Sequence, residues 1–169
     1  MIGGTIRSYA GATLEFIRQE QAYVLLAEGD VVLGTLETVE RRVMRCTTRD
    51  GIWTFRGVRG SRLEAFAQTT TMRVARYVPR WLAGGTIAFD DGPRYKLRAP
   101  AFGAGWRVSE PRRGPELLKV SGVHAVEIAG RASPVHELPL LTMLALRAIL
   151  AEESLPLAGS PGGDGVVGF

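Results

Sequence analysis

Cysteine, lysine and histidine are all scarce in this sequence. Cys46 is the one cysteine in 169 residues, so the chain can form neither an intramolecular disulfide nor a zinc site built from several cysteines. The two histidines, His124 and His136, show none of the spacings by which histidines and cysteines share a metal ion. We expect structural or surface roles for both histidines, and we expect no metal.

A long apolar run is also missing. The most apolar segment, residues 138–151, would span about 21 Å as a helix, whereas a bilayer core is about 30 Å thick. Arg147 also interrupts this segment. Residues 1–11 lack the basic and apolar regions of a signal peptide. These absences predict a cytoplasmic protein with no transmembrane segment.

Positive charge is present, but it is diffuse. The net charge is +4, and Lys96 and Lys119 are the only lysines among 21 basic residues. We interpret the excess of arginine as the composition of a GC-rich, bacterial genome; anion binding by arginine side chains is the alternative. The arginines form no run typical of a nucleic-acid-binding tail, so we expect no nucleic-acid partner.

Short β-rich runs, separated by glycine, aspartate or proline, occupy most of the chain. Their spacing of about 8–12 residues is typical of an all-β sandwich or barrel. The sequence predicts eleven strands, with a possible twelfth at 13–17. The eleven are 23–27, 31–38, 43–47, 52–56, 62–67, 72–78, 85–89, 94–98, 106–109, 116–121 and 123–128.

Many of these runs alternate between apolar and polar residues. Tyr95 and Leu97 share one face of their strand, as do Trp106 and Val108, and the positions between them are basic. A period of two residues places one face in a core and the other in water. This pattern favours antiparallel strands.

Residues 137–153 form the one convincing helix. Their large apolar side chains point in every direction around the helix axis, so the helix must be surrounded by protein. We therefore predict a mainly β fold, a closed antiparallel barrel of about twelve strands around this buried C-terminal helix. Glu152 and Glu153 lie at the end of a helix that disfavours acids, and we expect a solvated, frayed last turn there.

One domain is predicted over residues 1–154, followed by a flexible tail at 155–169 that is rich in glycine and proline. The letters of residues 163–168 match the dinucleotide motif GxGxxG. A dinucleotide site, however, needs a helix that begins at the motif, and only one residue follows. We expect no cofactor.

The order of elements near the end of the chain resembles a known family. Residues 85–100 (GTIAFDDGPRYKLRAP), the strands at 106–108 and 117–120, and the helix LPLLTMLALRAIL follow as hairpin, strand, strand and buried helix. This order resembles the tubby C-terminal fold of tubby-like proteins, plant LURP-one-related proteins and phospholipid scramblases. The resemblance covers about residues 23–153 and is to the small, bacterial LURP-one-like branch. The cysteine cluster of scramblases is missing, so lipid anchoring is not implied.

Arg94, Lys96 and Arg98 are the candidate ligand-binding residues. Alternation places these three cations on the outer face of one strand, with Tyr95 and Leu97 on the other face. Because tubby domains bind phosphoinositide headgroups with basic residues on their barrels, the resemblance implies an anionic lipid site here. The alternative is a solvated strand face whose cations pair with acids on neighbouring strands.

Two further residues have open alternatives. Cys46 is expected to be a buried, inert strand residue; the alternative is a reactive thiol whose pKa nearby arginines lower. Arg147 either reaches a mouth of the barrel, where its stem covers apolar surface, or is buried against Glu127 or Glu137.

The sequence therefore predicts a non-enzymatic binding module that attaches peripherally to anionic phospholipid headgroups. A protein-interaction or structural assembly domain is the first alternative, and the oligomeric state stays open. An enzyme is the second alternative. It would need a surface pocket holding a histidine and a carboxylate, because the helix fills the barrel lumen. No catalytic residue is assigned.

Overall fold

The computed structural model of the chain describes residues 2–99, 105–121 and 124–153, so the expected tail at 155–169 lies outside the described residues. Twelve strands precede a single α-helix, α1 (Leu138–Glu153), and two short 3-10 helices, η1 (Ile6–Tyr9) and η2 (Gly130–Ala132), flank the strands. The strands are β1 (Thr13–Gln19), β2 (Ala22–Ala27), β3 (Val31–Glu40), β4 (Val43–Thr48), β5 (Gly51–Val58), β6 (Arg62–Ala67), β7 (Arg73–Pro79), β8 (Gly85–Phe89), β9 (Arg94–Arg98), β10 (Trp106–Ser109), β11 (Glu116–Ser121) and β12 (Ala125–Ile128).

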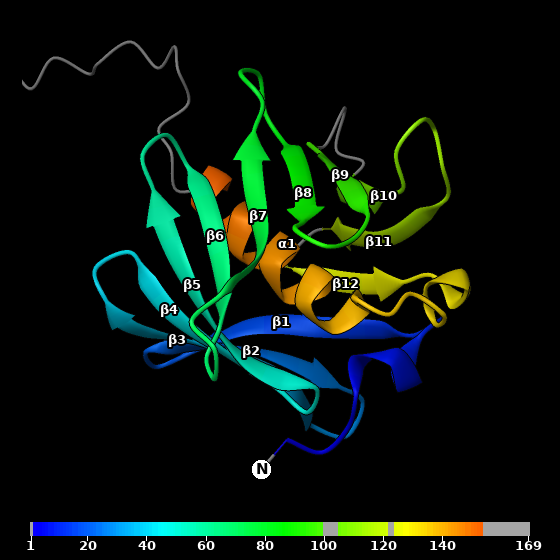
Figure 1. The fold of residues 1–169 in the computed structure, drawn as a ribbon. Coiled ribbons are helices and arrows are strands. Elements are labelled where there is room, and N and C mark those ends of the chain that lie inside the picture. Colours follow the sequence, from blue (N-terminus) through cyan, green and yellow to red (C-terminus); the bar gives the residue numbers. More distant parts are fainter. Residues whose placement is uncertain (1, 100–104, 122–123, 154–169) are drawn as a thin grey trace, which may run out of the picture.

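The twelve strands form one closed antiparallel barrel, as the sequence predicted (Figure 1). Each strand pairs with the next along the chain, and β1 pairs with β12 to close the wall, with Leu14 opposite Val126. The possible twelfth strand at residues 13–17 is therefore present as β1, and without it the barrel would not close.

The connections between strands alternate between the two ends of the barrel. Because every neighbouring pair is antiparallel, connections after odd-numbered strands lie at one end, and connections after even-numbered strands lie at the other. Glu153 at the C-terminus of α1 contacts His124 in the β11–β12 connection, whereas Glu137 before α1 contacts Tyr95 beside the β8–β9 turn. We call these ends the Glu153 end and the Glu137 end.

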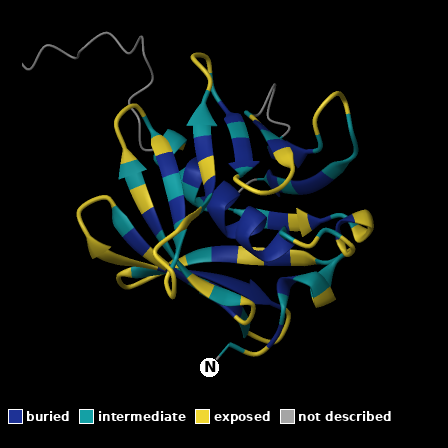
Figure 2. Cartoon of the chain, in the orientation of Figure 1, coloured by how far each residue is buried: buried dark blue, intermediate teal, exposed yellow. Residues whose placement is uncertain are grey.

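Alternation along the strands separates the core from the outer surface. On β9 and β10, the side chains of Tyr95, Leu97, Trp106 and Val108 are all buried, while the positions between them face outward. Figure 2 shows buried residues on α1 and along the inside of the wall, with exposed residues concentrated in the hairpins. The core is thus one continuous apolar cluster between the barrel wall and the helix.

Helix α1 lies inside the barrel and is buried on all sides. It begins at Leu138, one residue later than predicted, and its side chains from Leu138 to Leu146 are all buried. Thr142 is accommodated there because its hydroxyl donates to the carbonyl oxygen of Leu138 at 2.7 Å. The wall approaches closely at Gly34, where a Cβ atom would lie 2.9 Å from the sulfur of Met143. A side chain at Gly34 would therefore displace the end of the Met143 side chain.

Both ends of the helix are joined to the wall through carboxylates. The Tyr77 hydroxyl donates to Glu152 at 2.7 Å, and the imidazole of His124 lies 3.0 Å from a carboxylate oxygen of Glu153. At the other end, the Tyr95 hydroxyl donates to Glu137 at 3.4 Å. Glu153 is exposed, as predicted for the last turn. Helix-dipole reasoning did not predict, however, that wall side chains would contact both acids.

Substituting Leu144 by Asp should prevent folding. Leu144 is fully buried, and an unpaired buried carboxylate costs several kcal/mol, comparable with the ~5–15 kcal/mol that stabilises a typical domain. Circular dichroism and thermal unfolding would measure the effect. The matched control is Leu82→Asp, at a position that is 81% exposed, which should fold like the wild type. A cooperatively folded Leu144→Asp variant would contradict the internal position of the helix.

Candidate functional site

The three candidate cations lie on the outer face of β9, in the alternating arrangement that the sequence predicted. Arg94 and Arg98 are exposed and Lys96 is half-buried, while Tyr95 and Leu97 point into the core. In an extended strand the outward positions are about 6.6 Å apart, so the row spans about 13 Å. The local sequence thus places three positive charges in one line on the barrel wall.

No acid on the flanking strands lies directly opposite this row. Thr86 and Ala88 on β8 stand opposite Lys96 and Arg94, and Ser109 on β10 stands opposite Lys96 from the other side. Within the described part of the chain, none of the three cations forms an ion pair. Among the described residues, neighbouring carboxylates therefore do not neutralise this row, in contrast to the alternative.

Some of the other outward cations have carboxylate partners. Arg107, directly opposite Arg98, lies 3.4 Å from a carboxylate oxygen of Glu116, and Lys119 lies 3.8 Å from one of Glu127. Cross-strand pairs of this kind neutralise the wall over β10–β12. Positive charge is left uncompensated on β9.

A cleft of about 330 Å³ lies at the Glu137 end of the barrel. Its lining combines aromatic Trp53 and Phe89 with Arg7, Asp50 and Glu137. Two of these polar groups already have partners: Asp50 accepts from the Thr5 hydroxyl at 2.9 Å, and Glu137 accepts from Tyr95. His136 lines this cleft as well, and Arg7 donates to its backbone carbonyl oxygen, whereas the Nε of Arg7 is buried and has no partner in the described part of the chain. Part of the polar capacity of this cleft is therefore used to hold the fold.

A second cleft, of about 500 Å³, lies at the Glu153 end and contains His124 and Glu153. This pair has the histidine and carboxylate that an enzyme would need, and a histidine oriented by a carboxylate can act as a general base. Among the described residues that line it, there is no serine, threonine or cysteine to serve as a nucleophile. The pair joins the end of α1 to the β11–β12 connection, which agrees with the structural role expected for His124.

Two wall tyrosines have shifted titrations because of their burial. Burial, then the neighbouring carboxylate of Glu137, raises the pKa of Tyr95 from 10.0 to about 12. Burial, then the hydrogen bond to Glu152, raises the pKa of Tyr77 even further. Above pH 10 the folded protein therefore keeps both phenolic protons more strongly than the unfolded chain does.

Stability should consequently fall in alkaline solution. Below pH 10 both tyrosines are protonated in the folded and unfolded states. Above pH 10 the unfolded chain releases phenolic protons that the folded protein retains, so the free energy of unfolding decreases. The decrease due to Tyr95 continues until about pH 12. We expect Tyr77→Phe/Tyr95→Phe to lose less stability than the parent between about pH 8 and about pH 11 in urea unfolding. Both proteins would carry Cys46→Ala, since this thiol titrates in the same direction. Equal losses would show that these phenols do not set the pH dependence.

Cys46 is a buried strand residue, as the first alternative predicted. Its side chain is 0% exposed on β4, and burial raises the pKa of the thiol. Because the thiolate is the reactive form, the native protein should not react with a disulfide reagent such as dithionitrobenzoate, whereas the urea-unfolded chain should release about one equivalent of chromophore. Rapid labelling of the native protein would indicate that the barrel opens near β4.

Arg147 has no carboxylate partner among the described residues. It is half-buried on α1, burial lowers its pKa, and Tyr23 on β2 opposes that shift. Glu127 is paired with Lys119, and Glu137 accepts from Tyr95. These contacts favour an arginine that reaches toward a mouth of the barrel over one that is buried against either acid.

Metal and membrane features are limited in the part of the chain that the structure describes. There, no cluster of three or more histidine, cysteine, aspartate or glutamate side chains could hold a metal ion. Of the described helices, none has the length and apolar character needed to cross a bilayer.

Comparison with known proteins identifies a similar fold but no family. No family model matches the chain, and no curated protein matches it. An Arabidopsis thaliana protein of known X-ray structure is similar, with a TM-score of 0.60 and 8% sequence identity over 85% of this chain and 95% of that one. At this identity the likeness concerns the fold alone.

Proposed function

We propose that this protein is a non-enzymatic module that binds anionic phospholipid headgroups reversibly through the outer face of β9. The observation that carries the proposal is the row of Arg94, Lys96 and Arg98, which forms no ion pair among the described residues. Cations without partners keep their full attraction for an external anion, whereas cations already paired must first give up a carboxylate.

The dimensions of the row favour a surface over a single enclosed ligand. Three cations along about 13 Å of exposed strand match several lipid headgroups or one multiply phosphorylated headgroup. Each cation contributes roughly 1 kcal/mol near an anionic membrane, so the row supplies at most about 3 kcal/mol. Attachment of that strength is peripheral and weakens as salt screens the charges.

We also propose a distant relationship to the tubby C-terminal, LURP-one-related and scramblase group. The closed barrel that surrounds a C-terminal helix supports this relationship, as does the order of strands before that helix. If the relationship holds, the unpaired row on β9 would be the lipid headgroup site that the resemblance implies.

Removing the row should abolish binding to vesicles. We expect the wild type to float with liposomes that contain phosphatidylserine at low salt and to be released as salt rises, and we expect Arg94→Ser/Lys96→Ser/Arg98→Ser not to float. The matched control changes three exposed arginines near the Glu137 end, Arg49, Arg112 and Arg113, to Ser. This control loses the same net charge but leaves β9 intact. If the β9 row is the binding face, binding by the control should decrease much less.

Circular dichroism must first show that both triple variants fold. If the wild type does not float at low salt, lipid binding is wrong for this protein. If the β9 variant floats as well as the wild type, or if the two triple variants lose binding equally, β9 is not the binding face.

A further inference from the structure

The connection between β7 and β8 exposes two large apolar side chains. Trp81 is 92% exposed and Leu82 is 81% exposed, more than any other large apolar residue that the structure describes; Met72 follows at 65%. Scattered single apolar residues on a surface are ordinary, but a neighbouring tryptophan and leucine in water at a hairpin tip are not. Figure 1 shows this hairpin extending beyond the barrel wall.

The tip is a defined turn that is fixed to β9. The Arg80 N–H donates to the carbonyl oxygen of Gly84 at 2.7 Å, which closes the loop. Gly84 has φ +72°, and a Cβ atom there would lie 2.3 Å from the carbonyl oxygen of Leu97. Only glycine fits this position, so the base of the loop packs directly against the backbone of β9, while Trp81 and Leu82 stay exposed.

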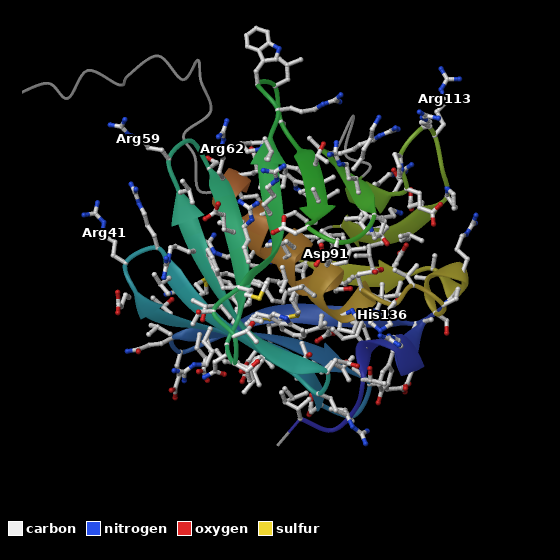
Figure 3. All side chains as sticks on the ribbon, viewed as in Figure 1. Arg41, Arg59, Arg62, Asp91, Arg113 and His136 are labelled. Carbon is white, nitrogen blue, oxygen red and sulfur yellow. The ribbon has the colours of Figure 1, made fainter. Side chains whose placement is uncertain are left out.

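Arginines are frequent on the tip and on other hairpins of the same end. Arg80 is part of it, and the β5–β6 and β3–β4 hairpins at the same Glu153 end carry Arg59, Arg62, Arg41 and Arg42. Figure 3 shows Arg41, Arg59 and Arg62 reaching outward on these hairpins, while Asp91 and His136 lie near the start of α1. Among the described residues, the acids at this end are Glu20 and Glu40 on the hairpins and Glu152 and Glu153 on α1, where they contact Tyr77 and His124. The tip itself and the β5–β6 connection beside it carry arginines and no acid.

We propose that the β7–β8 tip inserts Trp81 and Leu82 into the interfacial layer of an anionic bilayer, while the arginines around it contact headgroups. This inference rests on the proposed function and adds an apolar anchor to the cationic row. Tryptophan is enriched at the interface between lipid and water, where its ring is partly buried and its N–H stays hydrated. An apolar anchor combined with basic residues is the usual requirement for stable peripheral attachment.

A bilayer fits this feature better than a protein partner does. A stable protein interface buries about 800 Å² on each partner, far more than two side chains on a narrow tip provide. The exposed valines of this end, Val39 and Val58, are on other hairpins. Apolar groups spread over several hairpin tips among arginines suit a fluid surface that adapts to each tip.

Insertion also sets the orientation of the barrel. The side formed by the β7–β8 tip and the outer face of β9, from Arg98 to Arg94, would face the membrane. The strand connections at the opposite end would point away from the negative surface, and they carry more acids than arginines: Glu28, Asp30, Asp50, Asp91 and Glu110 against Arg49, Arg112 and Arg113. The distribution of charge along the barrel therefore opposes the inverted orientation.

Matched variants distinguish the apolar anchor from the cationic row. We expect Trp81→Ser/Leu82→Ser to bind phosphatidylserine vesicles about tenfold more weakly than the wild type, or about 1.4 kcal/mol. The control, Ile52→Ser/Met72→Ser, removes two exposed apolar side chains at the Glu137 end and should bind like the wild type. Sedimentation with vesicles at several lipid concentrations measures both.

Fluorescence reports insertion directly. The wild type should show a blue shift and quenching by vesicles that contain brominated phosphatidylcholine with phosphatidylserine. Trp81→Phe should bind the same vesicles without that quenching, because Trp53 and Trp106 belong to the barrel wall. Because this variant keeps Leu82 and an aromatic ring at position 81, it should still bind vesicles. Missing quenching would then report the absence of Trp81 and not a loss of binding.

The outcomes separate the two proposals. If the wild type binds but the tip variant binds equally well and quenching is not seen, insertion is wrong and binding through β9 stands. If the wild type binds no anionic vesicle, both proposals fail. If the wild type self-associates in gel filtration and the tip variant does not, the tip is a protein contact, and insertion is likewise wrong.

Discussion

The structure depends on enclosing a helix that is apolar on every side. Because α1 presents buried residues all around its axis, no single sheet face could cover it, and the wall must close. Closure requires β1 to meet β12, and it requires a close approach at Gly34, where the helix packs against β3. The carboxylates at the two ends of α1 then fix its position along the barrel axis, through Tyr95 at one end and Tyr77 and His124 at the other.

The fold could be predicted from the sequence because its main signals are local. Alternation with a period of two residues and glycine-containing turns located β8, β9, β10 and β11 with the bounds that the structure has. The all-round apolar helix then left a barrel as the only container. Contacts between distant segments could not be predicted in this way: Glu152 and Tyr77 are 75 residues apart, and their contact depends on the rotation of the helix within the wall.

The candidate site was predictable only in part, for the same reason. Alternation placed Arg94, Lys96 and Arg98 on one outer face, but whether acids would neutralise them depended on strand register, which set Arg107 opposite Arg98. Trp81 gave no signal in the sequence, because one aromatic residue in a turn has no periodicity. Its exposure becomes evident only when every neighbouring element is in place.

The position of α1 in the chain has a consequence for biosynthesis. The ribosome produces all twelve strands before Leu138–Glu153, so the wall emerges without the side chains that fill its interior. During that interval, at about 5–20 residues per second, the inward apolar residues have only one another or a chaperone to contact. The strands cannot reach their final packing until residues 138–153 have left the ribosome. Folding is therefore completed only after α1 has been synthesised, and a chain that stops before residue 138 would remain an aggregation-prone intermediate.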